Sequence, residues 1–252
     1  YLTGYEDFPL KEIKNFRQLG AKTAGHPENF LSDAIETTTG PLGQGIGNSV
    51  GLAMAEEIQR ANYGEKIVDH YTYVFAGDGC LMEGVSQEAI ALAGRQKLSK
   101  LIVFWDNNNI TIDGKVELSD TTNQVERFKS SGWNVIEIDG HNPVQINEAI
   151  IEAKKNNKPT MIACETHIAL GSSAQDTSKG HGALTDTKLI DETKHVYGWS
   201  KEKFHVPVEV KNEWEKIAQK GQKEKLSWEN RLASLSVKNQ SEFLRMYSME
   251  LP

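Results

Sequence analysis

Short apolar segments alternate with segments of helical spacing along most of the chain. Four β-rich apolar runs have the length of buried strands, and the segments between them place apolar residues on one helical face. The expected strands are Tyr71–Ala76, Leu101–Trp105, Asn134–Ile138 and Thr160–Cys164. The expected helices are Pro9–Leu19, Asn48–Arg60, Val85–Gln96, Val125–Ser131 and Ile146–Lys155. This alternation predicts an α/β fold, with a parallel sheet and helices on both faces.

The pattern changes after the fourth expected strand. Residues 169–187 are rich in Gly, Ser, Thr and Asp, and a polar loop of this length is usually functional or disordered. From about residue 199 the chain is rich in Lys and Glu, and weakly amphipathic helices are expected over Glu213–Gln219 and Trp228–Leu235. We therefore predict a binding domain over residues 1–198 and a helical linker over residues 199–252.

Composition narrows the class of protein. A chain of 252 residues can form one large α/β domain with an appendage. A net charge of −7 without a basic cluster argues against a nucleic-acid partner. Cys80 and Cys164 lie far apart, which fits a reducing cytoplasm better than a disulfide framework. No apolar run approaches the ~18 residues of a membrane helix, and no signal peptide is recognisable. Because the chain opens at Tyr1 without Met, we expect an upstream segment.

Polar residues follow the first two expected strands directly. Asp78 lies between two glycines after the first strand, and Asn108 lies thirty positions later, just past the second. Adjacent parallel strands would bring these two side chains to the same edge of the sheet, where open α/β sheets bind ligands. A carboxylate, an amide oxygen and a backbone carbonyl suit Mg²⁺, which usually shares its shell with phosphate oxygens and water.

A glycine-rich segment, Gly40–Gly47, precedes the first long expected helix. Free N–H groups at the start of a helix favour an anion. The segment does not complete a dinucleotide fingerprint, since no β-rich run leads into it. Helix packing is an equally good explanation of these glycines, and Gly-Asp-Gly or Asn-Asn-Asn alone would be ordinary turns. Only the combination of Asp78 and Asn108 at consecutive strand ends predicts a cation and diphosphate site.

Longer motifs carry a family resemblance. Gly77-Asp78-Gly79, followed after 27 residues by Asn107-Asn108, resembles the motif of thiamine-diphosphate enzymes. The surrounding sequence resembles the transketolase family over the whole chain. The segments that carry this likeness are Lys14–Leu19, Gly25–Glu28, Glu36–Gly45, Gly79–Gly84 and Ile110–Gly114.

The resemblance implies roles for individual residues. Asp78, Asn108 and the carbonyl of Ile110 resemble the Mg²⁺ ligands of the family. Contacts to thiamine diphosphate are implied for Gly40, Pro41, Leu42, Asp78, Gly79, Asn108, Ile168 and His181. His26 resembles a histidine that contacts sugar hydroxyls near the reacting carbons, and His181 one that touches both diphosphate and substrate. Glu83 and Glu88 resemble carboxylates at the interface of a homodimer.

The histidines also have simpler explanations. From sequence alone, His26 beside Pro27 is typical of a surface histidine, and His181 between glycines is as readily exposed as ligand-binding. The other five histidines, His70, His141, His167, His195 and His205, are interpreted as structural or solvated. The segment from Glu165 to Gly171 departs from the family's usual basic residue and from its small and aromatic pair. The loop from Ser172 to Gly180 is also one residue shorter than in bacterial members, which makes the position of His181 harder to predict.

The activity implied by the resemblance is transfer of a two-carbon ketol unit from a ketose phosphate to an aldose phosphate, in the pentose phosphate pathway. In the family, a pyrimidine-binding domain of the other subunit carries the glutamate that activates the cofactor. We expect that domain to lie outside this sequence, and the 252-residue chain alone to be inactive. The alternatives are an enzyme similar to dihydroxyacetone synthase, a subunit of a split transketolase, and a noncatalytic interaction module.

Overall fold

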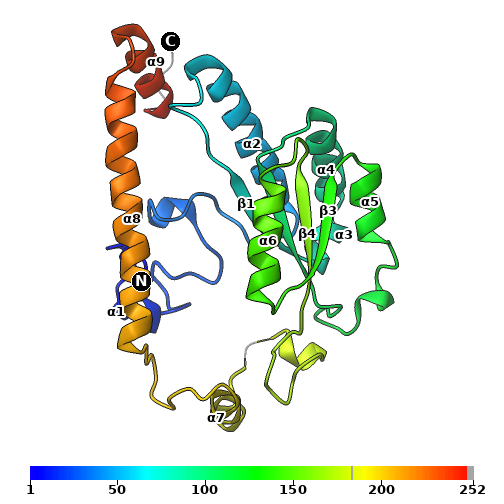
Figure 1. The fold of residues 1–252 in the computed structure, drawn as a ribbon. Coiled ribbons are helices and arrows are strands. Elements are labelled where there is room, and N and C mark those ends of the chain that lie inside the picture. The colour runs from blue at the N-terminus through cyan, green and yellow to red at the C-terminus, as the bar shows by residue number, and fades with distance from the viewer. Residues whose placement is uncertain (183, 249–252) are drawn as a thin grey trace. The chain divides into compact units, whose positions relative to one another are not determined.

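The computed structural model describes residues 1–182 and 184–248, which form two compact units (Figure 1). The first unit comprises residues 1–36, 55–70 and 206–252, and the second comprises residues 37–54 and 71–205. The first unit is thus assembled from three separated segments of the chain. The predicted division of the chain at residues 198 and 199 stays a prediction.

The second unit is built on a four-stranded parallel sheet, which confirms the predicted fold class. Its strands are β1 (Thr72–Gly77), β2 (Leu101–Asn107), β3 (Asn134–Asp139) and β4 (Thr160–Glu165). Their order in the sheet is β1-β2-β4-β3. In this register Gly77 pairs with Asp106, and Glu165 pairs with both Asn107 and Asp139. The carboxyl ends of all four strands therefore lie at one edge.

Helices cover both faces of this sheet. On one face α4 (Gly84–Gln96), α5 (Gln124–Ser130) and residues 44–54 of α2 (Gln44–Tyr63) contribute to one large apolar cluster with the strands. On the other face α6 (Pro143–Ala153) contributes Ala149 and Ala153 to a second cluster. The central strands β2 and β4 supply both clusters, which is why five successive residues of each are buried.

One expectation about β1 is wrong. The apolar run Tyr71–Ala76 predicts a strand buried on both faces, whereas Val74 and Ala76 are buried but Tyr73 and Phe75 are 44% and 81% exposed. β1 is an edge strand, and its exposed rings lie in a row in which Phe75 stacks on Phe104 with ring centroids 5.1 Å apart. Its side chains therefore alternate between a packed face and an open one.

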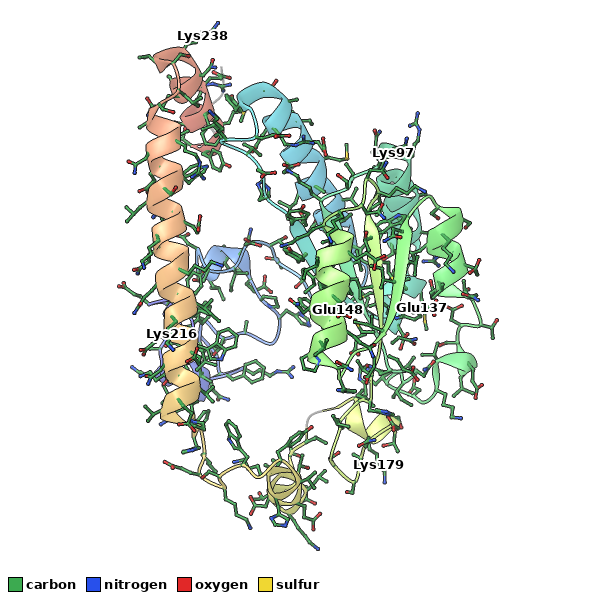
Figure 2. All side chains as sticks on the ribbon, in the orientation of Figure 1. Lys97, Glu137, Glu148, Lys179, Lys216 and Lys238 are labelled. Carbon is green, nitrogen blue, oxygen red and sulfur yellow. The ribbon has the colours of Figure 1, made fainter. Side chains whose placement is uncertain are left out.

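Three helical segments differ from the sequence prediction. A short helix, α3 (Asp78–Met82), begins at Asp78 immediately after β1. Helix α7 (Thr187–Val196) follows the polar region 169–187 and was not predicted. The two weak helices expected in the tail are one helix, α8 (Val208–Ala233), and α9 (Val237–Tyr247) follows it. Charged side chains such as Lys216 and Lys238 project from these two helices (Figure 2).

The first unit has its own apolar cluster. Ile67 and Val68 pack against Leu232 of α8 and Phe243 of α9. The unit also contains α1 (Leu10–Lys14) and a short 3-10 turn, Asn29–Leu31. Across the described residues of both units, no helix combines the length and the hydropathy that a membrane span requires.

Candidate functional site

Asp78 is fixed at the junction of β1 and α3. Its side chain is buried, with 7% relative exposure of the residue, and its Oδ1 accepts a hydrogen bond of 3.0 Å from the indole N–H of Trp105 on the neighbouring strand. The second carboxylate oxygen, Oδ2, is buried without a hydrogen-bond partner. A buried carboxylate oxygen without a partner is costly in a stable fold. The arrangement is therefore suited to receive a cation or a donor from a bound molecule.

The electrostatics of Asp78 agree with this interpretation. Burial raises the pKa of the Asp78 carboxyl above its usual range, and hydrogen bonds from the side chain of Trp105 and the backbone of Asn109 lower it only in part. The nearby carboxylates Asp106 and Asp120 raise the pKa further. A cation beside the carboxylate would relieve both effects, because it favours the ionised form.

Asn108 lies beyond the end of β2, as the sequence predicts. Its Oδ1 accepts a hydrogen bond of 3.0 Å from the backbone N–H of Ile110, and its Nδ2 donates to Asp106 at 3.1 Å. Asn109 between them has φ +61°, a left-handed conformation that asparagine tolerates better than most residues. Ile110 is buried and is bridged to Lys115 across a tight turn. The turn thus holds the Asn108 amide and the Ile110 backbone close together.

These residues line two adjoining cavities. Asp78 faces a cavity of about 340 Å³ together with Asn107, Asn109 and Gln124. Asn108 and Ile110 face a second cavity of about 360 Å³, and Asn109 borders both. The structure therefore brings the predicted ligands to one edge of the sheet, with Asn109 between the two openings.

The donor set fits a hard cation. Asp78 offers a free carboxylate oxygen, and the amide oxygen of Asn108 has a second lone pair besides the one that accepts from Ile110. Together with a carbonyl such as that of Ile110, these are the oxygen ligands that Mg²⁺ takes, completed by phosphate and water. No group of three or more His, Cys, Asp or Glu side chains suited to a metal occurs among the described residues. This agrees with a site that contains a single carboxylate.

The glycine loop packs against the segment that follows α3. Gly43 has φ +81°, and a Cβ there would lie 2.8 Å from the side chains of Glu83 and Val85. A Cβ on Gly79 would lie 3.0 Å from Leu42. Gly40, Pro41 and Leu42 are exposed beside this contact. The glycines therefore allow the close approach of the 40–43 loop to α3, and they leave three predicted cofactor contacts open.

The segment after β4 carries two more predicted contacts. Ile168 is half-buried, and its carbonyl accepts a hydrogen bond of 3.2 Å from the backbone of Asp176. His181 is exposed and follows the 3-10 turn Ser178–Gly180. Both residues belong to the second unit, as do Asp78 and Asn108.

The remaining predicted residues are all exposed. Glu83 and Glu88 lie at the start of α4, where Glu83 is the residue before the first turn. His26 belongs to the first unit, and its role in the site stays a prediction. Exposure agrees with a partner or a substrate as the contact, but does not test either.

One cluster was missed by the sequence interpretation. His141 and His167 were taken as structural or solvated, yet their rings stack with centroids 5.7 Å apart, and His167 also contacts Asp176. His167 and Asp176 line the same cavity as Asn108 and Ile110. The available signal was position, since His141 follows β3 and His167 follows the neighbouring β4.

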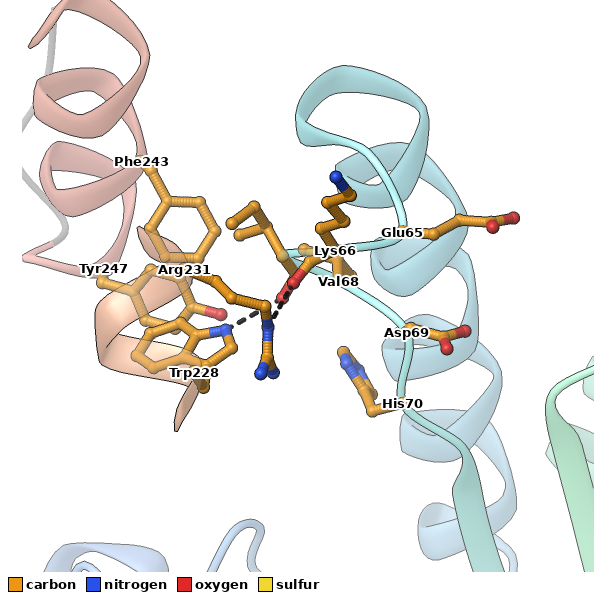
Figure 3. Close-up of a pocket in the computed structure, with 10 residues that line it drawn as sticks. Glu65, Lys66, Val68, Asp69, His70, Trp228, Arg231, Phe243 and Tyr247 are labelled. Carbon is orange, nitrogen blue, oxygen red and sulfur yellow. Dashed lines mark hydrogen bonds between the residues drawn. The ribbon is translucent and has the colours of Figure 1, made fainter. Parts of the chain in front are cut away.

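Another cavity is lined by a different set of residues. A cavity of about 510 Å³ in the first unit is lined by the 65–70 segment and by residues of α8 and α9 (Figure 3). Two of its polar side chains bind backbone carbonyls: the indole of Trp228 donates to Ile67 at 2.9 Å, and Arg231 donates to Lys66 at 2.8 Å. We therefore place the candidate site at the sheet edge, where buried polar groups are left unpaired.

Comparison with known proteins shows the family of the chain. The sequence profile of the family described as "Transketolase, thiamine diphosphate binding domain" matches residues 1–252. The chain belongs to the transketolase family. It is 52% identical to a transketolase of Rhodobacter capsulatus over 246 residues, which are 97% of this chain and 37% of that protein.

Solved structures of transketolases show the same fold. The structure of the Leishmania mexicana enzyme is 41% identical and has a TM-score of 0.95, with 100% of this chain and 39% of that one covered. A Pichia stipitis transketolase in complex with sedoheptulose-7-phosphate is 43% identical with a TM-score of 0.94, over 100% of this chain and 38% of that one. This transketolase-family chain therefore spans less than two fifths of the length of these relatives.

Proposed function

We propose that this chain supplies the half of a transketolase site that binds magnesium and the diphosphate of thiamine diphosphate. The observation that carries the proposal is the buried, unpartnered Oδ2 of Asp78 at the end of β1, beside the strand that leads to Asn108. The matching family is described by its thiamine diphosphate binding domain. Mg²⁺ is proposed as the cation because the oxygen donors at this edge of the sheet are the kind of ligands that it binds.

Each part of the site has a proposed role. Asp78, Asn108 and the carbonyl of Ile110 hold Mg²⁺. The exposed 40–42 loop and the nearby Gly79 contact the cofactor. The backbone of Ile168 and the imidazole of His181 contact the diphosphate from the segment after β4.

The proposed reaction is transfer of a two-carbon ketol unit from a ketose phosphate to an aldose phosphate. When bound, the cofactor supplies an electron sink for the carbon unit that is transferred. His26 and His181 orient substrate hydroxyls or move protons between them and solvent. A relative that was solved with sedoheptulose-7-phosphate supports sugar phosphates as the substrate class. We place this reaction in the pentose phosphate pathway and in the cytoplasm.

A second subunit is part of the proposal. Glu83 and Glu88 are exposed at the start of α4, where they are free to meet a partner. We propose a homodimer in which the other half of each site comes from a pyrimidine-binding domain of the other subunit. The 252-residue chain alone is then expected to show negligible transfer from ketose to aldose when it is assayed with thiamine diphosphate and Mg²⁺.

The test of the metal site is a substitution at Asp78. We expect Asp78→Ala to weaken the Mg²⁺-dependent binding of thiamine diphosphate by at least ~100-fold, since a paired charge and a ligand are both lost. Calorimetric titration of the cofactor into the purified chain, with and without Mg²⁺, measures this loss. Far-UV circular dichroism reports whether the fold is retained.

Asp33→Ala is the matched control, because Asp33 is exposed and its loss changes the net charge equally. It should bind the cofactor as the wild-type chain does. Equal affinity of Asp78→Ala and wild type at the same Mg²⁺ concentration would refute the proposed metal site.

A further inference from the structure

Three side chains, one from the turn after β3 and two from the segment after β4, form a chain of contacts. The backbone N–H of His167 donates to Nε2 of His141 at 2.9 Å. Nδ1 of His167 lies 3.0 Å from both carboxylate oxygens of Asp176. Because Nε2 of His141 accepts, its proton lies on Nδ1, which fixes the tautomer of that ring. We call His141, His167 and Asp176 the histidine clasp.

The sheet holds one end of the clasp rigidly. The backbone of Gly140 donates to the Glu165 carbonyl at 2.8 Å, so that the turn after β3 crosses the end of β4. A Cβ on Gly140 would lie 2.5 Å from Thr166 and 2.9 Å from Cys164. His141 follows directly, and its backbone N–H donates to Asp139. The position of His141 is thus set by a contact that glycine alone permits.

The other end of the clasp is a loop, residues 168–182, which we call the β4 loop. It is closed by its own polar contacts, including a bond of 2.9 Å from the backbone of Gly171 to the side chain of Gln175. Ala169 and Asp176 have positive φ values of 51° and 56°. This backbone conformation is energetically unfavourable for residues other than glycine. The loop therefore needs outside contacts to keep this shape.

We propose that His167 is a positioning residue that holds the β4 loop against the sheet edge, so that the backbone of Ile168 and the ring of His181 meet the cofactor's diphosphate. The inference rests on the proposed function, because it names what the loop positions. Its basis is geometric. His167 contacts Asp176 on the loop, and its ring stacks on His141, which follows β3. His167 and Asp176 also line the same cavity as Asn108 and Ile110.

The charges around the clasp favour this grip. The hydrogen bond from Gln175, followed by that from His167, holds the pKa of the Asp176 carboxyl below its usual range. Asp176 is therefore an anionic acceptor at neutral pH, and a hydrogen bond to a charged group is stronger than one between neutral groups. Lys115, Glu117 and Glu165 line the same cavity.

The experiment compares three substitutions of His167 by two readouts. The first readout is amide hydrogen exchange of residues 168–182 in the cofactor-free chain. The second is the Kd of thiamine diphosphate at fixed Mg²⁺. His167→Ala should speed exchange of the loop and raise the Kd, each by ~10-fold, the size expected for a residue that orients a binding group.

His167→Asn should restore most of both losses, because its Nδ2 donates from nearly the position of the imidazole Nδ1. His167→Gln, whose amide lies one carbon farther out, should resemble His167→Ala. His195→Ala is the control, since His195 is exposed on α7 and contacts neither the clasp nor its loop. It should leave both readouts unchanged.

The outcomes separate this inference from the function on which it rests. If wild type binds the cofactor but His167→Ala leaves loop exchange or the Kd unchanged, the positioning role alone is overturned. Failure of Asn to rescue better than Gln overturns the Nδ1 grip. If the wild-type chain shows no Mg²⁺-dependent binding of thiamine diphosphate, the proposed function fails and the inference fails with it, even where the loop opens.

Discussion

The carboxyl ends of β1 and β4 hold their polar residues in different ways. At the end of β1, Asp78 is buried and receives a hydrogen bond from Trp105, a core residue of the neighbouring strand. At the end of β4, His167 and Asp176 are about half exposed. They contact each other, and His167 also contacts His141 on the turn after β3. The first region inherits its geometry from the packing of the sheet. The second depends on a few polar contacts between exposed segments, so it should open at a smaller cost.

The glycine loop next to α3 gives the largest expected effect. Gly43→Ala places a side chain at φ +81° and within 2.8 Å of Glu83 and Val85. Backbone strain and overpacking together should destabilise the chain by roughly 2–4 kcal/mol, as measured by urea unfolding. Gly51 is the matched control, because it lies in α2 and a Cβ there meets nothing within 4 Å. Gly51→Ala should stabilise the chain by about 0.5–1 kcal/mol. Equal changes in stability at the two glycines would contradict rigid packing of the 40–43 loop against the segment that follows β1.

The indole of Trp105 gives the next largest effect. Trp105→Phe removes the side-chain donor to the buried Asp78 carboxylate, which should cost roughly 1–3 kcal/mol of stability. Because the carboxylate also loses its orientation, we expect the Kd of thiamine diphosphate with Mg²⁺ to rise by about 10-fold or more. Calorimetry and urea unfolding on the same preparation measure the two effects.

A second buried tryptophan separates these effects. Trp133 donates to the Ile90 carbonyl at 2.9 Å and is 3% exposed, against 7% for Trp105. Trp133→Phe should destabilise the chain by a similar amount and leave cofactor binding unchanged. If both substitutions weaken cofactor binding equally, the effect at Trp105 comes from lower overall stability. The claim that Trp105 orients the Asp78 carboxylate for binding would then be disproved.

The two strand ends also differ in what the sequence could predict. The four strands and the placement of Asp78 and Asn108 follow from apolar periodicity, because packing of the sheet dictates that pattern. The hydrogen bond from Trp105 to Asp78 joins two residues 27 positions apart, and no periodicity encodes which side chain on a neighbouring strand donates. The clasp was harder still to predict, since it needs the turn after β3 to meet the loop after β4.

Local propensity explains the other misses. Helix α7 starts at the end of the region 169–187 that composition marks as a loop, and its cap is Asp186, whose side chain accepts from the backbone of Lys188. The open face of β1 was missed for a different reason. Tyr73 and Phe75 are as apolar as the residues of a buried strand, and it is the position of β1 at the edge that exposes them.

A glycine in the β4 loop should give a smaller effect than Gly43. A Cβ on Gly180 would lie 2.8 Å from Ala169 and from the Ala174 carbonyl, but all of these groups belong to one loop that can shift together. We expect Gly180→Ala to cost less than about 1 kcal/mol of global stability and to speed amide exchange of residues 168–182. A loss as large as that of Gly43→Ala would show that the loop is part of the core.

Cys164 gives the smallest expected effect and tests the boundary between the two regions. It is the last but one residue of β4 and is 8% exposed, and the loop segment begins soon after it. Burial, with a further contribution from Asp106, raises the pKa of the Cys164 thiol to about 11. The thiol should therefore stay protonated and react slowly with iodoacetamide at pH 8, because the thiolate is the nucleophile.

The sign of the accompanying stability change follows from linkage. Since the folded thiol holds its proton to about pH 11, above the ordinary value of 9.0, the folded chain binds more protons than the unfolded chain between those pH values. Stability from this group is complete below pH 9 and is lost as pH rises through about 11. Cys164→Ser should lessen that loss, and Cys80→Ser, which changes the half-buried thiol of α3, is the control for labelling. Rapid labelling of Cys164 at pH 8 in the Cys80→Ser variant would show that the end of β4 opens together with its loop. The last residues of β4 would then belong to the easily opened region and not to the rigid sheet.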